Sequence, residues 1–137
     1  MVNVVSRYGW VYYHEDDHTY GDPELTGKWM YFWSDRDTVV ALCEKAVSSG
    51  VVQQCKHTDG SDGVACFYGH IDDLAFHKRV IEFFIDNDMI RRTKAGKLYN
   101  ISFKLDNQTR AGEYGSDFSG AMKLSNLMDL STGEWLV

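Results

Sequence analysis

The segment that most constrains the fold is residues 27–33, where five of seven side chains are large and apolar. This composition indicates a central β-strand that is buried on both faces. Side chains alternate along a strand. The even-numbered positions therefore share one face: Lys28, Met30 and Phe32. The odd-numbered positions share the other: Trp29, Tyr31 and Trp33.

Two segments have the apolar spacing of amphipathic α-helices. The first follows Ser34, a good N-cap residue, runs through Ser48 and ends at Gly50. Its apolar stripe consists of Val39, Leu42, Cys43, Ala46 and Val47. The second covers residues 71–87, and its wider apolar arc predicts deeper burial. His77 lies on that arc, so we expect a packed core histidine rather than a ligand.

The remaining regular segments predict more strands. Residues 2–13 form a first strand or extended arm, and residues 51–56 and 63–70 suggest an antiparallel hairpin. Residues 99–105 alternate between apolar and polar side chains, and residues 121–137 indicate a last strand or short helix. The whole chain of 137 residues is expected to be one α+β domain. Its two helices would pack on one face of a curved, mainly antiparallel sheet.

The net charge of −6 argues against duplex nucleic acid as a partner, because binding a phosphate backbone requires a basic face. A small phosphorylated ligand needs only a local cluster of cations and stays open. No apolar run approaches about 18 residues, and the N-terminal segment lacks a signal-peptide pattern, so we expect a cytoplasmic protein without membrane contact. Cys43, Cys55 and Cys66 are an odd number without CxxC spacing, which favours buried free thiols over a disulfide.

Two charged segments allow alternative interpretations. Residues 14–27 contain consecutive histidine and acidic residues, which suit a solvated acidic loop better than a metal site. Residues 88–98 hold four cations within seven positions and indicate either a solvated turn or a rim that attracts phosphate. The sequence lacks the common nucleotide-loop, hydrolase and metalloprotease motifs, and no cofactor is expected. Asp72 and Asp73 are better explained by helix capping than by paired-carboxylate catalysis.

The candidate site is a set of cations on predicted strands, followed by an arginine in a glycine-bounded turn. Its members are Lys28, Lys56, Lys104 and Arg110. A lysine is costly to bury unless it is paired or bound to an anion, so convergence of these groups would form a phosphate site. Trp29, Phe67 and Tyr114 are candidates to stack on a base. Alternatively, each lysine reaches solvent from a strand end along its aliphatic stem.

The chain resembles the family of phosphothreonine lyase domain-containing proteins over most of residues 10–115. The resemblance rests on the segment at Gly27, Lys28 and Trp29. It also rests on a second pattern formed by Lys104, Asp106, Thr109, Gly112 and Tyr114. That family is grouped by fold with the cap-binding translation initiation factor of the 4E type. The resemblance implies a curved sheet backed by helices. It also implies either a β-elimination lyase, with Lys104 or Lys28 as base and His70 as acid, or a binder of a phosphorylated nucleotide.

Three functional hypotheses follow. The first is non-enzymatic binding of a small phosphorylated ligand or nucleotide by Lys28, Lys56, Lys104 and Arg110, with Trp29 and Tyr114 covering the base. Such a protein would suit a phage or mobile-element factor that sequesters a nucleotide signal in an anti-defence role. The second is a lyase acting on phosphothreonine or phosphoserine. The third is an acidic protein–protein inhibitor that uses residues 14–24. The high aromatic content also suggests a homo-oligomer.

Overall fold

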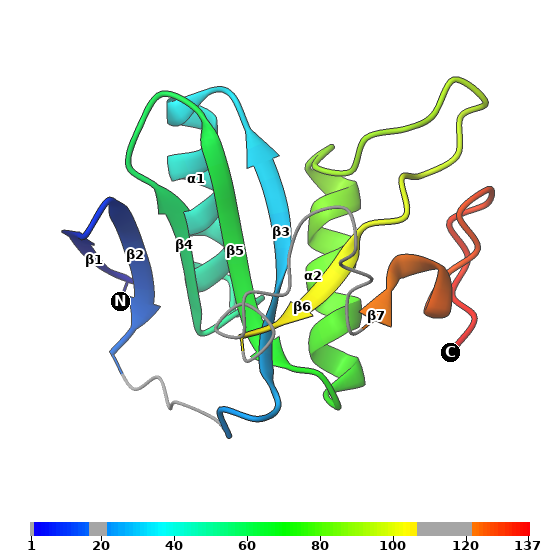
Figure 1. Cartoon of the computed structure of the whole chain (residues 1–137), viewed down its shortest axis with the longest axis horizontal. Coiled ribbons are helices and arrows are strands. Elements are labelled where there is room, and N and C mark those ends of the chain that lie inside the picture. The colour runs from blue at the N-terminus through cyan, green and yellow to red at the C-terminus, as the bar shows by residue number, and fades with distance from the viewer. Residues whose placement is uncertain (1, 17–21, 107–121) are drawn as a thin grey trace.

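The computed structural model describes residues 2–16, 22–106 and 122–137. Within them the chain forms an α+β fold, in which an open seven-stranded antiparallel sheet has two helices packed against it (Figure 1). The strands are β1 (Val2–Arg7), β2 (Trp10–Glu15), β3 (Thr26–Trp33), β4 (Gln54–Thr58), β5 (Gly63–His70), β6 (Ser102–Leu105) and β7 (Met122–Lys123). The helices are α1 (Arg36–Ser48), α2 (Leu74–Asp86) and a short 3-10 turn, η1 (Leu124–Asn126). The strand order is β1-β2-β4-β5-β3-β6-β7.

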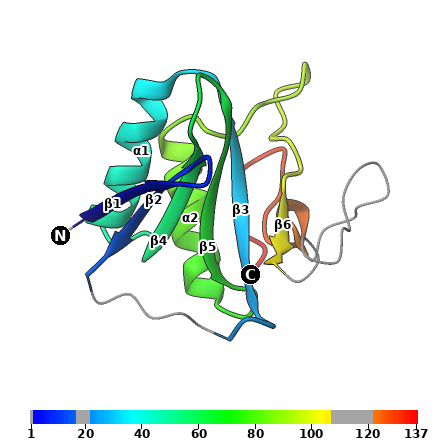
Figure 2. The same ribbon diagram turned by 60° about the vertical axis from the view of Figure 1, so that its left-hand side comes forward.

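The expectation of a sheet backed by two helices is confirmed, and the strand at residues 27–33 lies inside the sheet. Its expected burial on both faces is wrong at Phe32, which is 65% exposed because no layer of the described residues covers that end of the face opposite the helices. β3 pairs with β5 on one side and with β6 on the other, both antiparallel. Both helices lie behind the same face of the sheet (Figure 2). Side chains of the strands that point toward the helices form the core, including Tyr13, Trp29, Phe67 and Phe103, each at most 1% exposed. The alternation of side chains along the strands therefore assigns one face of the sheet to the core.

The N-terminal segment differs from the single strand expected for residues 2–13, because it folds into a hairpin. β1 and β2 pair antiparallel in a register that places Arg7 opposite Trp10. The two-residue turn uses Tyr8 and Gly9 at φ values of +53° and +79°. Positive φ at both positions is the geometry whose twist matches that of the flanking strands. Tyrosine is an unusual residue at the first of these positions, which is why the turn is hard to recognise in the sequence.

The two helices begin and end at capping residues. Asp35, rather than the expected Ser34, is the N-cap of α1, and its carboxylate accepts the backbone N–H of Thr38 at 3.2 Å. The apolar stripe predicted for α1 is buried in full. Asp73 caps α2 by accepting the N–H of Phe76 at 3.1 Å, as the capping interpretation predicted. A side-chain acceptor at this position satisfies one of the free N–H groups at a helix start.

Two strands begin later than the sequence indicates. Residues 51 and 52 were expected in β4, but both backbone N–H groups donate to the carbonyl of Ala46 and close the end of α1. Residues 99 and 100 were expected in β6, but the Tyr99 N–H donates to Arg91 and the Asn100 side chain accepts the N–H of Ser125. In both places, hydrogen bonds to a neighbouring segment replace the strand pairing. The segment after β7 packs Leu124, Leu127 and Met128 into the core.

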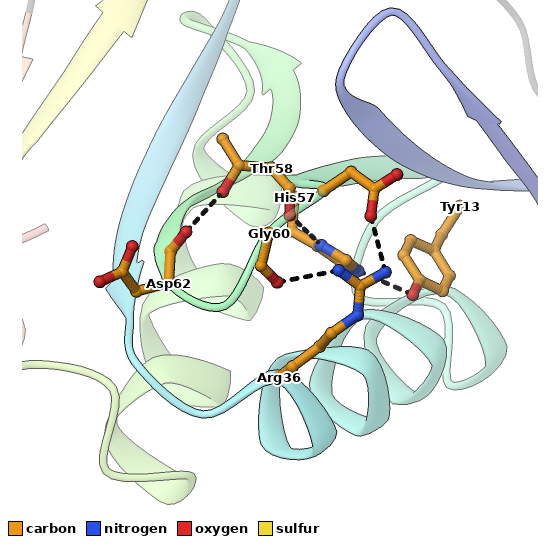
Figure 3. A network of polar contacts seen from close by, with 7 residues as sticks. Tyr13, Arg36, His57, Thr58, Gly60 and Asp62 are labelled. Carbon is orange, nitrogen blue, oxygen red and sulfur yellow. Dashed lines mark hydrogen bonds and ion pairs between the residues drawn. The ribbon is translucent and has the colours of Figure 1, made fainter.

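A polar network joins the start of α1 to the turn between β4 and β5 (Figure 3). Arg36 donates to the Gly60 carbonyl and forms an ion pair with Asp59, each at 2.8 Å. Beside it, the Nδ1–H of His57 donates to the Thr58 carbonyl at 2.8 Å, since a carbonyl only accepts. His57 Nε2 and the hydroxyl of Tyr13 are hydrogen-bonded at 2.9 Å. The network therefore satisfies both ring nitrogens of a fully buried histidine.

The three cysteines, Cys43, Cys55 and Cys66, are buried free thiols, as the sequence predicted. Among the described residues, no helix is both long enough and apolar enough to cross a bilayer.

Candidate functional site

The strand lysines lie on the sheet face opposite the two helices. Lys28 is directly opposite Lys104 on β6 and opposite Tyr68 on β5. Lys56 on β4 is directly opposite Cys66 on β5 and opposite Tyr12 on β2. Directly opposed residues point to the same side of a sheet. We call this surface the lysine face, and we define it by Trp10, Tyr12, Lys28, Lys56, Cys66, Tyr68 and Lys104.

Lys28 and Lys104 form a pair of like charges in register. Their Cβ atoms are about 4.5–5.5 Å apart by the geometry of cross-strand neighbours. Each residue is only 7% exposed, so neither ammonium is well hydrated. Lys28 Nζ forms an ion pair with Asp106 Oδ1 at 2.7 Å. Burial lowers the pKa of Lys104, and the charge of Lys28 lowers it further. The pair therefore concentrates positive charge in a poorly solvated position.

Lys56 lies in a cluster of aromatic rings on the same face. Its Nζ atom is 3.9 Å from the ring centroid of Trp10, 5.6 Å from that of Tyr12 and 5.8 Å from that of Tyr68. Such cation–π contacts stabilise an ammonium where water is scarce. Within the described part of the chain, no carboxylate forms an ion pair with Lys56. Burial lowers the pKa of Lys56, and the charge of Lys28 contributes in the same direction.

Two neutral groups complete the lysine face. Burial raises the pKa of the Cys66 thiol to about 11, so the thiol is protonated at neutral pH and is a poor nucleophile. Burial also raises the pKa of the Tyr68 phenol well above its usual range. The Tyr68 hydroxyl therefore stays protonated and can donate a hydrogen bond to an anion. Asp106 supplies the one acidic side chain that the described structure places in an ion pair with these lysines.

The predicted aromatic residues on β3 and β5 are in the core instead. Trp29 is fully buried, and its Nε1–H donates to His77 Nδ1 at 3.0 Å. Phe67 is also fully buried and packs against Phe84 of α2 with ring centroids 5.2 Å apart. Adjacent residues on a strand point to opposite faces, so Trp29 cannot share a surface with Lys28. Neither ring belongs to the lysine face. Arg110 and Tyr114 lie outside the described residues.

Aromatic residues that the sequence reasoning missed occupy that place. Trp10, Tyr12 and Tyr68 lie on predicted strands but are not among the predicted site residues. For Tyr68 the sequence does contain a signal. Tyr68 lies two positions after Cys66 in the predicted strand, so the two side chains share one face of the sheet. No comparable signal exists for Trp10 and Tyr12, because strand alternation does not show that β2 pairs with β4. Asp106 was noted only as part of the family pattern.

The other candidate groups have structural roles in the described residues. His77 is 1% exposed, and its Nε2–H donates to the Ile71 carbonyl at 2.7 Å, so it is the packed core histidine that was expected. The cations of residues 88–98 are exposed on a loop, and Arg92 donates to the Gly96 carbonyl at 3.0 Å. No group of three or more histidine, cysteine or acidic side chains with the arrangement of a metal site occurs in the described ranges.

The arrangement as a whole is suited to holding an anion. It combines two buried lysines, a third that is partly exposed, a protonated phenol and aromatic rings on one face of the sheet. No protein-family model matches the chain, and no curated protein matches it significantly. The resemblance to the family of phosphothreonine lyase domain-containing proteins therefore stays a prediction.

Proposed function

We propose that the lysine face binds a small phosphorylated ligand, most consistently a nucleotide, without catalysing a reaction. The observation that carries this proposal is the opposed pair of buried lysines, Lys28 and Lys104, with Lys56 on the same face. Like charges directly opposite one another destabilise a sheet. An anion bound between them converts this repulsion into attraction.

Three lysines on one face favour a ligand with more than one negative charge. Lys28, Lys56 and Lys104 lie on that face, where Asp106 forms an ion pair with Lys28. A phosphate monoester carries about −1.5 to −2 charges at neutral pH, so it can contact more than one ammonium group. Poorly hydrated ammonium groups also bind phosphate without first losing a full shell of water. A dianion on this face would raise the pKa of Lys104 and Lys56.

Aromatic side chains beside the cations favour a nucleotide over simple phosphate. Trp10 and Tyr12 on β2 are partly exposed and lie next to Lys56. Stacking of a base on an aromatic ring contributes about 1–3 kcal/mol, and it tolerates different bases. The proposal therefore places phosphates toward Lys28 and Lys104 and the base toward β2.

Isothermal titration calorimetry tests the proposal with mono-, di- and cyclic nucleotides, and with inorganic phosphate and an uncharged nucleoside as separate arms. The variants Lys104→Met and Lys28→Met keep the aliphatic stem and remove the charge. Loss of one charged hydrogen bond should weaken nucleotide binding roughly tenfold to a hundredfold. The matched control is Lys94→Met, an exposed lysine on the basic loop. It should bind as the unaltered protein does.

Two results would overturn the proposal. One is the absence of binding heat from every nucleotide at about 1 mM, the weak end of specific affinity. The other is equal affinity of Lys104→Met and Lys94→Met for a nucleotide that does bind. Binding of inorganic phosphate with the same affinity would remove the nucleotide part of the proposal and leave an anion site.

A second candidate function is β-elimination from phosphothreonine or phosphoserine, and one observation favours it. The lowered pKa of Lys104 increases the fraction of free amine, which a general base requires. His70 lies on the same face of β5 as Tyr68. In this reaction the amine takes the α-proton, the C–O bond breaks and phosphate leaves, so an alkene remains in the peptide. Mass spectrometry of a phosphothreonine peptide incubated with the protein decides this. An unchanged peptide mass argues against the lyase.

A further inference from the structure

We infer that the outer edge of β1 pairs with β1 of a second copy of this chain and joins the two sheets into one. In the described structure, β1 lies at the end of the strand order and is paired with β2 alone. Figure 1 shows this hairpin at the left-hand edge of the sheet. Such a strand presents a row of backbone donors and acceptors that can pair with another strand.

β1 lacks the features by which proteins usually protect a sheet edge. It is six residues long, contains no proline or lysine and carries exposed valines on both of its faces. Val4 is 51% exposed and Val5 is 41% exposed. The opposite edge is different, because β7 has only two residues and continues directly into η1. Length and apolar character therefore favour association at β1 and not at β7.

Charge complementarity selects one register for the pairing. In an antiparallel pair with a two-fold axis perpendicular to the sheet, opposed residues must point to the same side. An axis through Val5 places Val5 opposite itself and Arg7 of the second copy opposite Asn3. The Asn3 side chain donates to the exposed carboxylate of Asp16. For this contact each guanidinium swings from its place over the Tyr12 ring toward an aspartate of the other copy, and the symmetry forms the contact twice.

Pairing in this register also sets the direction of the two lysine faces. Arg7 lies on the same side of the sheet as Tyr12, over whose ring its guanidinium is placed at 5.5 Å. A perpendicular two-fold axis keeps that side common to both copies. The dimer would therefore present both lysine faces on one surface. The inference does not depend on what those faces bind.

Sedimentation velocity over a wide concentration range, up to about 1 mM, tests the dimer, because small interfaces lie at the weak end of specific affinity. Val5→Lys places two like charges directly opposite one another and should weaken the dimer about tenfold or more. Val137→Lys is the matched control, since Val137 is also exposed, at 53%, and lies far from β1 in the chain. A monomer at all concentrations, or a dimer that Val5→Lys leaves intact, would overturn the inference.

A charge exchange tests the register. Arg7→Asp and Asp16→Arg should each weaken the dimer, because each places like charges together. The double variant restores opposite charges at both contacts and should recover most of the affinity. Failure of the double variant to recover refutes this register. Hydrogen exchange of the β1 amides at low and high protein concentration gives a second measurement, and protection confined to β1 is the supporting result.

Discussion

His77 offers a sharp test of the claim that Trp29 belongs to the core and not to a ligand site. His77 accepts the Trp29 indole N–H and donates to the Ile71 carbonyl, at 3.0 Å and 2.7 Å. Replacement of His77 by leucine keeps the volume approximately and removes both interactions. A buried N–H without a partner costs about 1–3 kcal/mol, and the partly buried carbonyl costs less. We expect His77→Leu to lower the free energy of unfolding by about 2–4 kcal/mol.

Urea unfolding of a double-mutant cycle measures the contact itself. Trp29→Phe removes the indole N–H and some volume, so it destabilises the protein on its own. In the His77→Leu background the N–H has no partner to lose, and Trp29→Phe should cost about 1–3 kcal/mol less there than in the unaltered protein. Costs that add within about 0.5 kcal/mol would refute the reasoning. Nucleotide affinity should be unchanged by Trp29→Phe, whereas a stacking role of the larger indole ring predicts weaker binding.

The unaltered protein and His77→Leu can also be compared as a function of pH. Burial lowers the pKa of His77 below its ordinary value of 6.5. The unfolded chain therefore takes up a proton on His77 near pH 6.5, while the folded chain does not. The contribution of His77 to the free energy of unfolding is therefore complete above pH 6.5. It decreases as the pH falls toward the folded pKa, by at most about 1.4 kcal/mol per pH unit. The difference between the unaltered protein and His77→Leu should shrink over that range. A constant difference would contradict it.

Three further outcomes follow from the geometry. Gly27→Ala would place a Cβ atom 2.5 Å from the Lys104 carbonyl oxygen and 2.6 Å from the Phe103 ring. It should therefore lower the free energy of unfolding in urea by about 1–3 kcal/mol and weaken ligand binding. Gly60→Ala has room for its Cβ atom and should do neither. The pKa of Lys104 is lowered in the folded protein. Its contribution to the free energy of unfolding is therefore complete above about pH 10.5 and decreases as the pH falls toward the folded pKa. Lys104→Met should abolish this pH dependence. Tyr8→Asn should raise the melting temperature, since Tyr8 is 90% exposed at a φ of +53° and asparagine relieves about 0.5–1 kcal/mol of backbone strain; an unchanged or lower melting temperature would contradict this.

Much of the fold was predictable because its strongest patterns are local. The stripe of α1 and the alternation of β3 depend on spacing alone, and both appear as expected. The strand starts were less predictable, since hydrogen bonds made outside the sheet decide them. The Val52 N–H donates to Ala46 near the end of α1, and the Asn100 side chain accepts the N–H of Ser125.

The candidate site was predictable only in part. Three lysines at strand positions indicated a shared face, and the register places them on one. Their neighbours depended on which strands pair, and the pairing of β2 with β4 has no local signal. Trp29 could have been excluded from the predicted site, because strand alternation places its side chain on the other face of the sheet from Lys28. Arg110 and Tyr114 lie outside the described residues, and their place in the site stays a prediction.

The strand order has a consequence for how the protein is made. Lys28 and Asp106 are 78 positions apart in the chain, and within the described ranges β3 pairs only with strands that follow it. Contacts between such distant segments slow folding into the range of milliseconds to seconds. Ribosomes add roughly 5–20 residues per second, so the hairpin of β1 and β2 can form long before β3 acquires its partners. The lysine face is thus assembled late, when β6 emerges, and a chain that stops before β6 would contain both helices but no complete lysine face.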